Sequence, residues 1–132
     1  MPLIQPSIKT LSGFESFTRV ITRGTKYESK PIKAFVCSSP SLQTGLRIGF
    51  TVTRRIRKAT RRNLIKRLMK EAFRTKKEGF FAKIDSGILF EIVFLYNGDV
   101  KTPPKKIRFA VINQAMADLS STINFVCPQV KI

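Results

Sequence analysis

Residues 54–77 read RRIRKATRRNLIKRLMKEAFRTKK, and this stretch is the starting point for predicting the fold of the whole chain. It holds twelve of the 25 Lys and Arg residues and a single acid, Glu71. From Thr60 onward the apolar residues fall on one half of a helical wheel. They are Leu64, Ile65, Leu68, Met69, Ala72 and Phe73. We therefore predict an amphipathic helix that begins at a Thr60 N-cap and buries this half.

The opposite half of the predicted helix is basic. It carries Asn63, Lys66, Arg67, Lys70 and Arg74 at spacings of three and four, so these side chains lie along one face. Like charges four residues apart destabilise an isolated helix by roughly 0.2–0.5 kcal/mol per pair, and almost no acid relieves them here. A solvated face is the simpler alternative, but charge of one sign favours an anionic polymer as partner.

Length and net charge limit the class of protein. The 132 residues carry a formal net charge of +17, and 42% of them are hydrophobic. We expect a flexible N-terminal segment over residues 1–10 and one globular domain over residues 11–132. The charge favours nucleic acid or an anionic membrane surface. Because no apolar run reaches the roughly 18–20 residues of a membrane span, and no signal peptide is recognisable, we expect a cytoplasmic protein.

Groups for catalysis or metal binding are sparse. The chain has no histidine, and its two cysteines, Cys37 and Cys127, are far apart, which excludes a zinc site of the usual Cys/His spacing. The commonest general base is therefore missing. The eight carboxylates occur singly, without the pairing that two-metal or acid–base chemistry uses. We predict no catalytic residue and no metal site in the protein alone, so a partner would supply any chemistry.

Periodicity and turn residues predict the remaining elements. These are a helix over 11–23, a short edge strand over 25–29, strands over 32–38, 46–53 and 88–96, and a helix over 107–121, with a turn-rich link over 76–87. A strand, helix and strand in succession around the basic helix indicate a crossover packed on a sheet. The predicted fold is a two-layer α+β or α/β sandwich in the order α-β-β-β-α-β-α.

Several details of these elements follow from local patterns. Ser12 with Glu15 three residues later is the capping-box arrangement at the start of the first helix, and Gly24 should end it. In strand 32–38, Lys33 and Phe35 should lie on the face opposite Ile32. Strand 46–53 has one polar face, suited to solvent or to binding, and strand 88–96 reads as covered on both faces. The last helix should bury Ile107, Val111, Ala115 and Leu119.

The stretch around the basic helix resembles the bacterial ribonuclease P protein component. That family carries a run of the form K-A-V-x-R-N-R-x-K-R on this helix, and the matching residues here are Lys58, Ala59, Arg62, Asn63, Lys66 and Arg67. An upstream Arg-x-Gly-x-x-Val pattern matches at Arg47, Gly49 and Val52. Further upstream, Phe17, Val20, Gly24 and Phe35 fit the family's first helix and second strand. The resemblance covers roughly residues 11–120 in element order.

Two positions depart from the family motif. Leu64 stands where the family's third motif residue is normally arginine, and Arg57 stands where a glycine usually precedes the lysine. Since Leu64 lies on the apolar half of the wheel, the sequence exchanges one RNA contact for core packing. Arg57 removes the access to positive φ that glycine gives to the loop before the helix.

The resemblance implies a function. In this family the RNA subunit cuts the 5′ leader from precursor tRNA, and the protein subunit binds the catalytic RNA and the leader, with Mg²⁺ held mainly by the RNA. The protein would thus belong to an endoribonuclease, a hydrolase, without being active alone. The partners implied are the catalytic RNA and precursor tRNA, with no membrane. The resemblance also implies a left-handed crossover around the basic helix, against the usual right-handed rule.

The resemblance also implies site residues. RNA binding would use Arg54, Arg55, Lys58, Arg61, Arg62, Asn63, Lys66, Arg67, Lys70 and Arg74. A cleft floored by the sheet and walled by the first helix would take the leader, with Phe17, Lys33 and Phe35 as its candidates. Taken without the resemblance, each phenylalanine is more typical of a core.

Two other functions remain as alternatives. A ribosomal or other structural RNA-binding protein of similar fold would share the charge and the lack of catalytic groups, but would not need the ordered motif. A binder of membrane surfaces or acidic proteins is disfavoured, because the apolar half of the basic helix is suited to a core.

Overall fold

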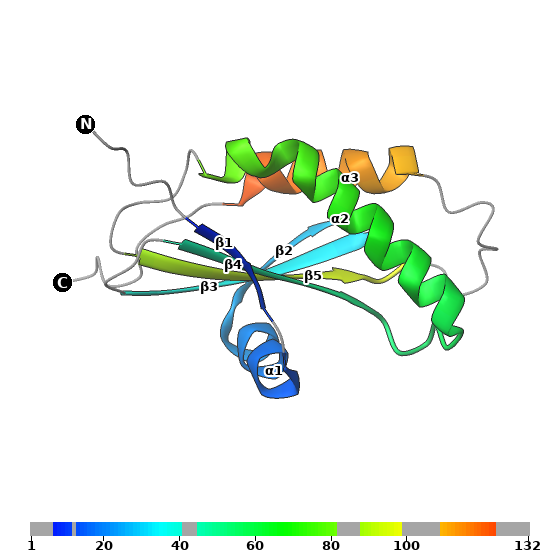
Figure 1. Cartoon of the computed structure of the whole chain (residues 1–132), viewed down its shortest axis with the longest axis horizontal. Helices are drawn as coiled ribbons and strands as arrows, with labels where there is room; N and C mark the ends of the chain where they lie inside the picture. Colours follow the sequence, from blue (N-terminus) through cyan, green and yellow to red (C-terminus); the bar gives the residue numbers. More distant parts are fainter. Residues whose placement is uncertain (1–6, 12, 41–44, 82–87, 99–108, 124–132) are drawn as a thin grey trace.

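A five-stranded sheet with helices on both faces forms the protein, as seen in a computed structural model that describes residues 7–11, 13–40, 45–81, 88–98 and 109–123 (Figure 1). The sheet order is β1-β4-β5-β3-β2, in which β1 and β5 run parallel to β4, and the other pairs are antiparallel. The elements are β1 Ser7–Thr10, α1 Phe14–Arg23, β2 Thr25–Ser29, β3 Ile32–Pro40, β4 Gly45–Val52, α2 Ala59–Phe81, β5 Ile88–Tyr96 and α3 Phe109–Thr122.

The central strand β5 joins the two halves of the sheet. It pairs with β3 on one side and with β4 on the other, and seven of its nine residues are buried. Its alternate residues enter two cores: Phe90 and Phe94 face α2 and α3, whereas Val93 faces α1. The prediction of a strand covered on both faces is therefore confirmed.

Helix α2 covers one face of the sheet with the apolar half that the sequence predicts. Ile65 and Met69 are fully buried and Phe73 nearly so. Two predictions about its ends are wrong, because the helix already begins at Ala59 rather than after a Thr60 cap, and it continues to Phe81 through the predicted link. The extension follows from Phe80, which lies about two turns beyond Phe73 on the same side of the helix. Phe80 is fully buried, which offsets the helix-weakening Gly79.

Helix α3 lies beside α2 on the same face (Figure 1). The side chains that it buries are Ile112, Ala115, Met116 and Leu119. The predicted line was right for Ala115 and Leu119 but wrong for Val111, which is 51% exposed, while position 107 lies outside the described residues. Steps of four residues drift around a helix of 3.6 residues per turn, so the contact line shifts to its neighbours. Lys76 of α2 donates to Asn113 Oδ1 at 2.6 Å and holds the two helices together.

Helix α1 packs on the opposite face of the sheet, so the protein has three layers where the sequence suggested two (Figure 1). Val20 is its most deeply buried residue. The N-cap residue of the helix is Gly13, with φ 96°, rather than the predicted Ser12, which lies outside the described residues. The predicted end is confirmed, because the Gly24 N–H donates to the Val20 carbonyl at 2.8 Å.

The N-terminal strand β1 is a further correction. Residues 1–10 were predicted to be flexible, but Ser7–Thr10 pair in parallel with β4 at the edge of the sheet. The pairing continues in Leu11, whose N–H donates to the Ile48 carbonyl at 2.8 Å and whose side chain is buried beneath α1. A run of only four residues gives little periodicity, so the sequence carries a weak signal for this strand. Residues 1–6 lie outside the described part of the chain.

Since β4 and β5 are parallel neighbours, α2 is the crossover between them. The left-handedness of this crossover stays a prediction.

Arg62 holds the connection from β4 to α2. Arg62 Nη1 donates to the carbonyls of Thr53 and Ile56, each at 2.9 Å. Arg62, expected only as an RNA contact, is therefore also a clamp on this loop.

Replacing Arg62 with alanine should lower the free energy of unfolding by roughly 1–3 kcal/mol, because two loop carbonyls lose a charged donor. Arg67, exposed on the same helix, is the matched control, and Arg67→Ala should change stability by less than about 0.5 kcal/mol. Urea unfolding followed by circular dichroism measures both. Equal effects of the two substitutions would mean that the clamp contributes nothing.

Candidate nucleic-acid interface

The exposed face of α2 is basic, as the sequence predicts. Asn63, Arg67, Lys70 and Arg74 are exposed, and Lys66 is half-buried. Arg74 Nη2 donates to Glu71 Oε1 at 2.8 Å, and this hydrogen bond with the nearby carboxylate raises the pKa of Arg74. The face therefore presents several fixed positive charges to solvent, the arrangement that phosphate groups require. Its role in RNA binding stays a prediction.

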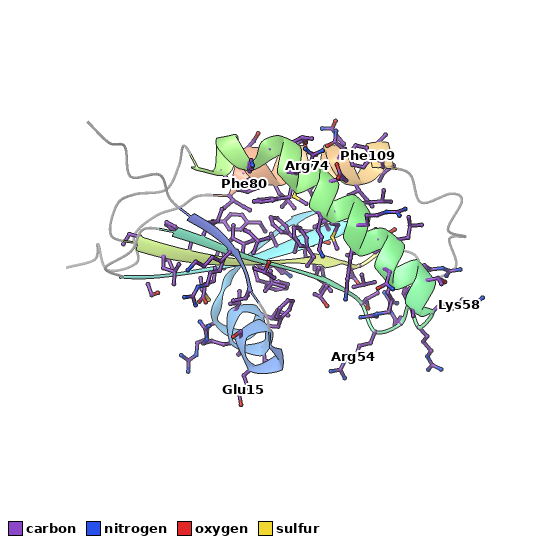
Figure 2. All side chains as sticks on the ribbon, viewed as in Figure 1. Glu15, Arg54, Lys58, Arg74, Phe80 and Phe109 are labelled. Atoms are coloured by element: carbon purple, nitrogen blue, oxygen red, sulfur yellow. The ribbon has the colours of Figure 1, made fainter. Side chains whose placement is uncertain are left out.

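The chain around the start of α2 adds further positive charge. Figure 2 shows Arg54 and Lys58 projecting outward at this end of the helix. Arg55 is also exposed, and its Nη2 lies 3.4 Å from Asn97 Oδ1. Arg61 is half-buried, and so is Arg62.

Leu64 occupies the position at which this chain departs from the family motif. It is half-buried, consistent with its predicted place on the apolar half of α2. At this position the helix therefore contributes packing where an arginine would contribute charge.

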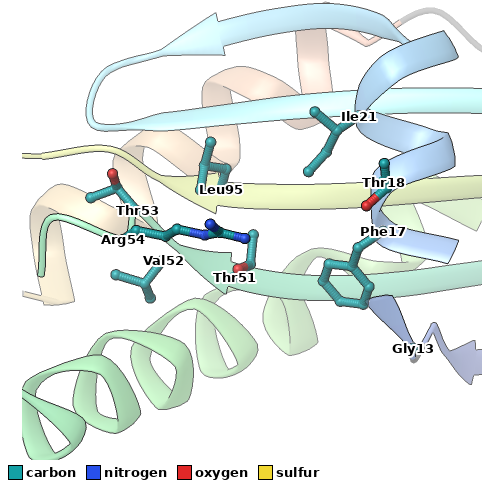
Figure 3. Close-up of a pocket in the computed structure, with 9 residues that line it drawn as sticks. All are labelled: Gly13, Phe17, Thr18, Ile21, Thr51, Val52, Thr53, Arg54 and Leu95. Carbon is teal, nitrogen blue, oxygen red and sulfur yellow. The ribbon is translucent and has the colours of Figure 1, made fainter. Parts of the chain in front are cut away.

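A cleft of about 610 Å³ lies between α1 and the sheet (Figure 3). Helix α1 forms one wall with Phe17, Thr18 and Ile21, and the strands β4 and β5 form the other with Thr51 and Leu95. Arg54 lines the same cleft, so the cleft continues into the basic region at the start of α2. The remaining lining residues are Gly13, Val52 and Thr53. A mainly apolar slot with a cationic end fits a stacked base and its phosphate.

The Phe17 ring is positioned by Gly49 of β4. A Cβ atom on Gly49 would lie 2.5 Å from Phe17 Cζ, closer than real Cβ contacts allow. The tip of the ring therefore rests directly on the backbone of the strand, and only glycine leaves that space. Phe17 lines the cleft, and Gly49 is the reason that the ring reaches it, whereas contact between Phe17 and a leader stays a prediction.

Phe35 and Lys33 share a sheet face, as predicted, but neither lines the cleft. Phe35 is only 9% exposed and packs with Val20 and Val93 in the second core, which is the smaller apolar cluster between α1 and the sheet. Its assignment to the cleft is therefore wrong. The reason is that α1 lies directly over this part of β3. Lys33 is half-buried, and its partner in β5 is Leu95, so it lies one strand beyond the cleft wall.

Sequence reasoning missed Thr18, Ile21, Thr51 and Leu95 as cleft residues. Only Thr51 had left a signal, because it belongs to the polar face of strand 46–53. Leu95 and Ile21 read as ordinary core residues, and their exposure depends on where α1 sits on the sheet.

On the side of α1 away from the cleft, exposed Arg19 pairs with buried Glu91. Arg19 Nη1 and Nη2 donate to the two carboxylate oxygens of Glu91 at 2.6 and 3.0 Å, and this bidentate bond raises the pKa of Arg19. Arg47 Nη1 lies 3.8 Å from Glu91 Oε2. Burial raises the pKa of the Cys37 thiol, and the charge of Glu91 raises it further. The thiol is thus protonated at neutral pH and a poor nucleophile.

Within the described residues, no three His, Cys, Asp or Glu side chains come together as metal ligands. The buried carboxylate Glu91 is engaged by Arg19. None of the helices in this part of the chain is long and apolar enough to cross a membrane.

Comparisons with known proteins agree on one family. The sequence profile of the family described as Ribonuclease P matches residues 6–121. The Ribonuclease P protein component of Bacillus velezensis is 34% identical over 64 residues, which are 48% of this chain and 54% of that protein. The chain thus spans about half the length of this curated relative in the match.

Solved structures show the same fold. The RNase P protein of Thermotoga maritima superposes with a TM-score of 0.67 at 23% identity, covering 87% of this chain and 97% of that one. The RNase P protein of Staphylococcus aureus gives a TM-score of 0.61 at 17% identity, covering 85% and 92%. At these identities the likeness concerns the fold alone, whereas the profile match covers most of the sequence. The chain therefore belongs to the Ribonuclease P protein family.

Proposed function

We propose that this protein is the protein subunit of a ribonucleoprotein endoribonuclease that removes the 5′ leader from precursor tRNA. Its membership of the Ribonuclease P family over residues 6–121 is the observation that carries the proposal. The 34% identical relative is itself a Ribonuclease P protein component. The partners would be the catalytic RNA subunit and precursor tRNA. A separate structural RNA-binding role has no observation of its own in its favour.

Two surfaces divide the binding in this proposal. The basic face of α2, with Lys66, Arg67 and Lys70, would neutralise phosphates of the catalytic RNA. The cleft would hold the single-stranded leader, with one base stacked on Phe17 and a neighbouring phosphate beside Arg54. Because Arg54 adjoins both surfaces, a leader in the cleft would lie next to RNA bound on α2.

The chemistry would come from the RNA and its Mg²⁺. The sequence has no histidine, and the described carboxylate that is buried, Glu91, is paired with Arg19. What the protein residues can do is bind and orient the substrate, which raises the local concentration of leader at the RNA active site. Mg²⁺, held mainly by the RNA, would activate water and stabilise the leaving oxygen.

The purified protein alone should not cleave precursor tRNA, because its sequence has no histidine and its carboxylates occur singly. Adding it to a matching catalytic RNA at low Mg²⁺ should restore leader removal, measured by gel analysis of end-labelled substrate. The double variant Lys66→Gln, Lys70→Gln should weaken this rescue. It should also reduce the slope of log affinity against log salt concentration by roughly 0.7–0.9 per lost phosphate contact. Cleavage by protein free of nucleic acid would overturn the proposal.

Phe17→Leu should reduce the preference for precursor over mature tRNA by roughly fivefold or more, since stacking contributes about 1–3 kcal/mol per base. Gly49→Ala should act in the same direction, because its methyl group displaces the Phe17 ring. Neither change removes a charge, so the salt dependence should stay the same. Binding titrations with both tRNAs measure the preference.

Phe35→Leu is the matched control for these cleft variants, because Phe35 is buried in the second core. It should lower the melting temperature and leave the preference for precursor tRNA intact. If Phe35→Leu abolished the preference while Phe17→Leu kept it, the leader would lie elsewhere on the sheet.

A further inference from the structure

Glu91 of β5 is the only charged residue that is buried among the described parts of the chain. Its side chain is 5% exposed and lies on the α1 face of the sheet, where Arg19 holds it through two hydrogen bonds. Removing a carboxylate from water is costly even when it is paired, and an apolar side chain would fill the same place at a lower cost. Packing alone therefore does not account for Glu91.

Glu91 lines a second cavity, of about 330 Å³, on the side of α1 away from the cleft. The two cavities use opposite sides of one helix: Phe17 and Ile21 line the cleft, whereas Arg19 and Arg23 line the second cavity. Thr25, Ser38 and Ser39 are further polar residues of its lining. The cavity is thus rich in hydrogen-bond donors.

An open strand edge adds backbone donors to this cavity. Strand β2 pairs with β3 only from Ile32 to Val36, while β3 continues to Pro40 along β5. Among the described residues, no strand therefore lies beside Cys37–Ser39 on the side of β2. Alternate backbone N–H groups along such an edge point outward and can bind an anion.

The charge and geometry fit a phosphate group. A guanidinium has five N–H donors, and the two bonds to Glu91 use two of them, so Arg19, which is 42% exposed, keeps others for a ligand. The carboxylate fixes the plane of the guanidinium, which prepares it for a second bidentate partner. Arg23 and Arg47 supply positive charge beyond the one that Glu91 neutralises, and this excess offsets the carbonyls at the C-terminal end of α1.

We propose that this second cavity binds a phosphate group of single-stranded RNA, with Arg19 as the contact residue and Glu91 as the positioning residue. The inference rests on the proposed function in that it takes RNA as the ligand. A recess between a helix and a sheet edge admits the flexible backbone of a single strand. A duplex holds its phosphates on a rigid cylinder, which suits the open face of α2 better.

Glu91→Gln separates this role from general electrostatics by the sign of its effect. The substitution raises the net charge by one, so simple attraction predicts tighter RNA binding. If Glu91 orients Arg19, affinity for a short single-stranded oligouridylate should instead fall by roughly tenfold, the size of one charged hydrogen bond. Fluorescence anisotropy at fixed salt measures the affinity, and the melting temperature of each variant shows that it is folded.

Substitutions of Arg19 and Arg23, the two arginines that line the cavity, test the same site without altering Glu91. Arg19→Lys keeps the charge but loses the planar set of guanidinium donors, so affinity for the oligouridylate should fall. Arg57 is exposed and lines neither cavity, so the control Arg57→Lys should leave this affinity unchanged. Arg23→Gln should reduce the slope of log affinity against log salt concentration by about 0.7, as expected for one lost phosphate on a single strand. If Glu91→Gln fails to fold, Arg19→Lys and Arg23→Gln decide whether the cavity binds phosphate.

The outcomes distinguish failure of the proposed function from failure of the phosphate site. If the parent protein binds no single-stranded RNA, the proposed function fails. If the parent binds and Arg19→Lys behaves like Arg57→Lys, or Glu91→Gln binds more tightly, the second cavity is not a phosphate site and the proposed function stands. An effect confined to duplex RNA would likewise overturn the assignment to a single strand.

Discussion

The fold depends on burying one strand, β5, on both of its faces. Its residues Phe90 and Phe94 fill the core under α2 and α3, and Val93 fills the core under α1. Both flanking strands, β3 and β4, hydrogen-bond to it along its whole length or nearly so. Because every layer contacts this strand, the positions of the basic helix and of the cleft both follow from it.

The two faces of the sheet carry different chemistry. The face under α2 and α3 is a closed apolar core, in which Phe94 contacts the rings of Phe50, Phe73 and Phe80. Among the described residues, the ten of α1 are the helix that covers the other face, and cavities remain on either side of it. A short helix on a broad sheet thus creates binding space without any unusual backbone.

The sequence predicted the elements whose signal is local. Strands β2 and β5 were predicted with the observed bounds. In the predicted apolar half of α2, Ile65, Met69, Ala72 and Phe73 are buried, and Leu64 and Leu68 are half-buried. The missed features depend on tertiary contacts: β1 is held by pairing with β4, and the last turn of α2 exists because Phe80 reaches the core. From helix propensity alone, Gly79 was expected to lie in a link after the helix, whereas it lies within α2.

The candidate site was predictable to a similar extent. The basic face of α2 follows from helical spacing, and Phe17 from the family resemblance. The sequence could not distinguish the roles of Phe17 and Phe35, since both are aromatic residues next to the same sheet face. The placement of α1 buries Phe35 and leaves Phe17 lining the cleft. The bond from Arg19 to Glu91 joins residues far apart in the chain, so a carboxylate that looked isolated in sequence is paired in space.

The parallel pairing of β4 with β5 has a consequence for how the interface comes to exist. Gly45 pairs with Leu89, and the whole of α2 lies between them, whereas β2 and β3 are joined by a tight local turn. Closing such a long loop costs chain entropy before any contact repays it, so non-local pairs form slowly. Alone, α2 has like charges along one side and an unburied apolar half. Most of the stability of α2 therefore comes from packing on the sheet, and this packing requires distant halves of the chain to meet.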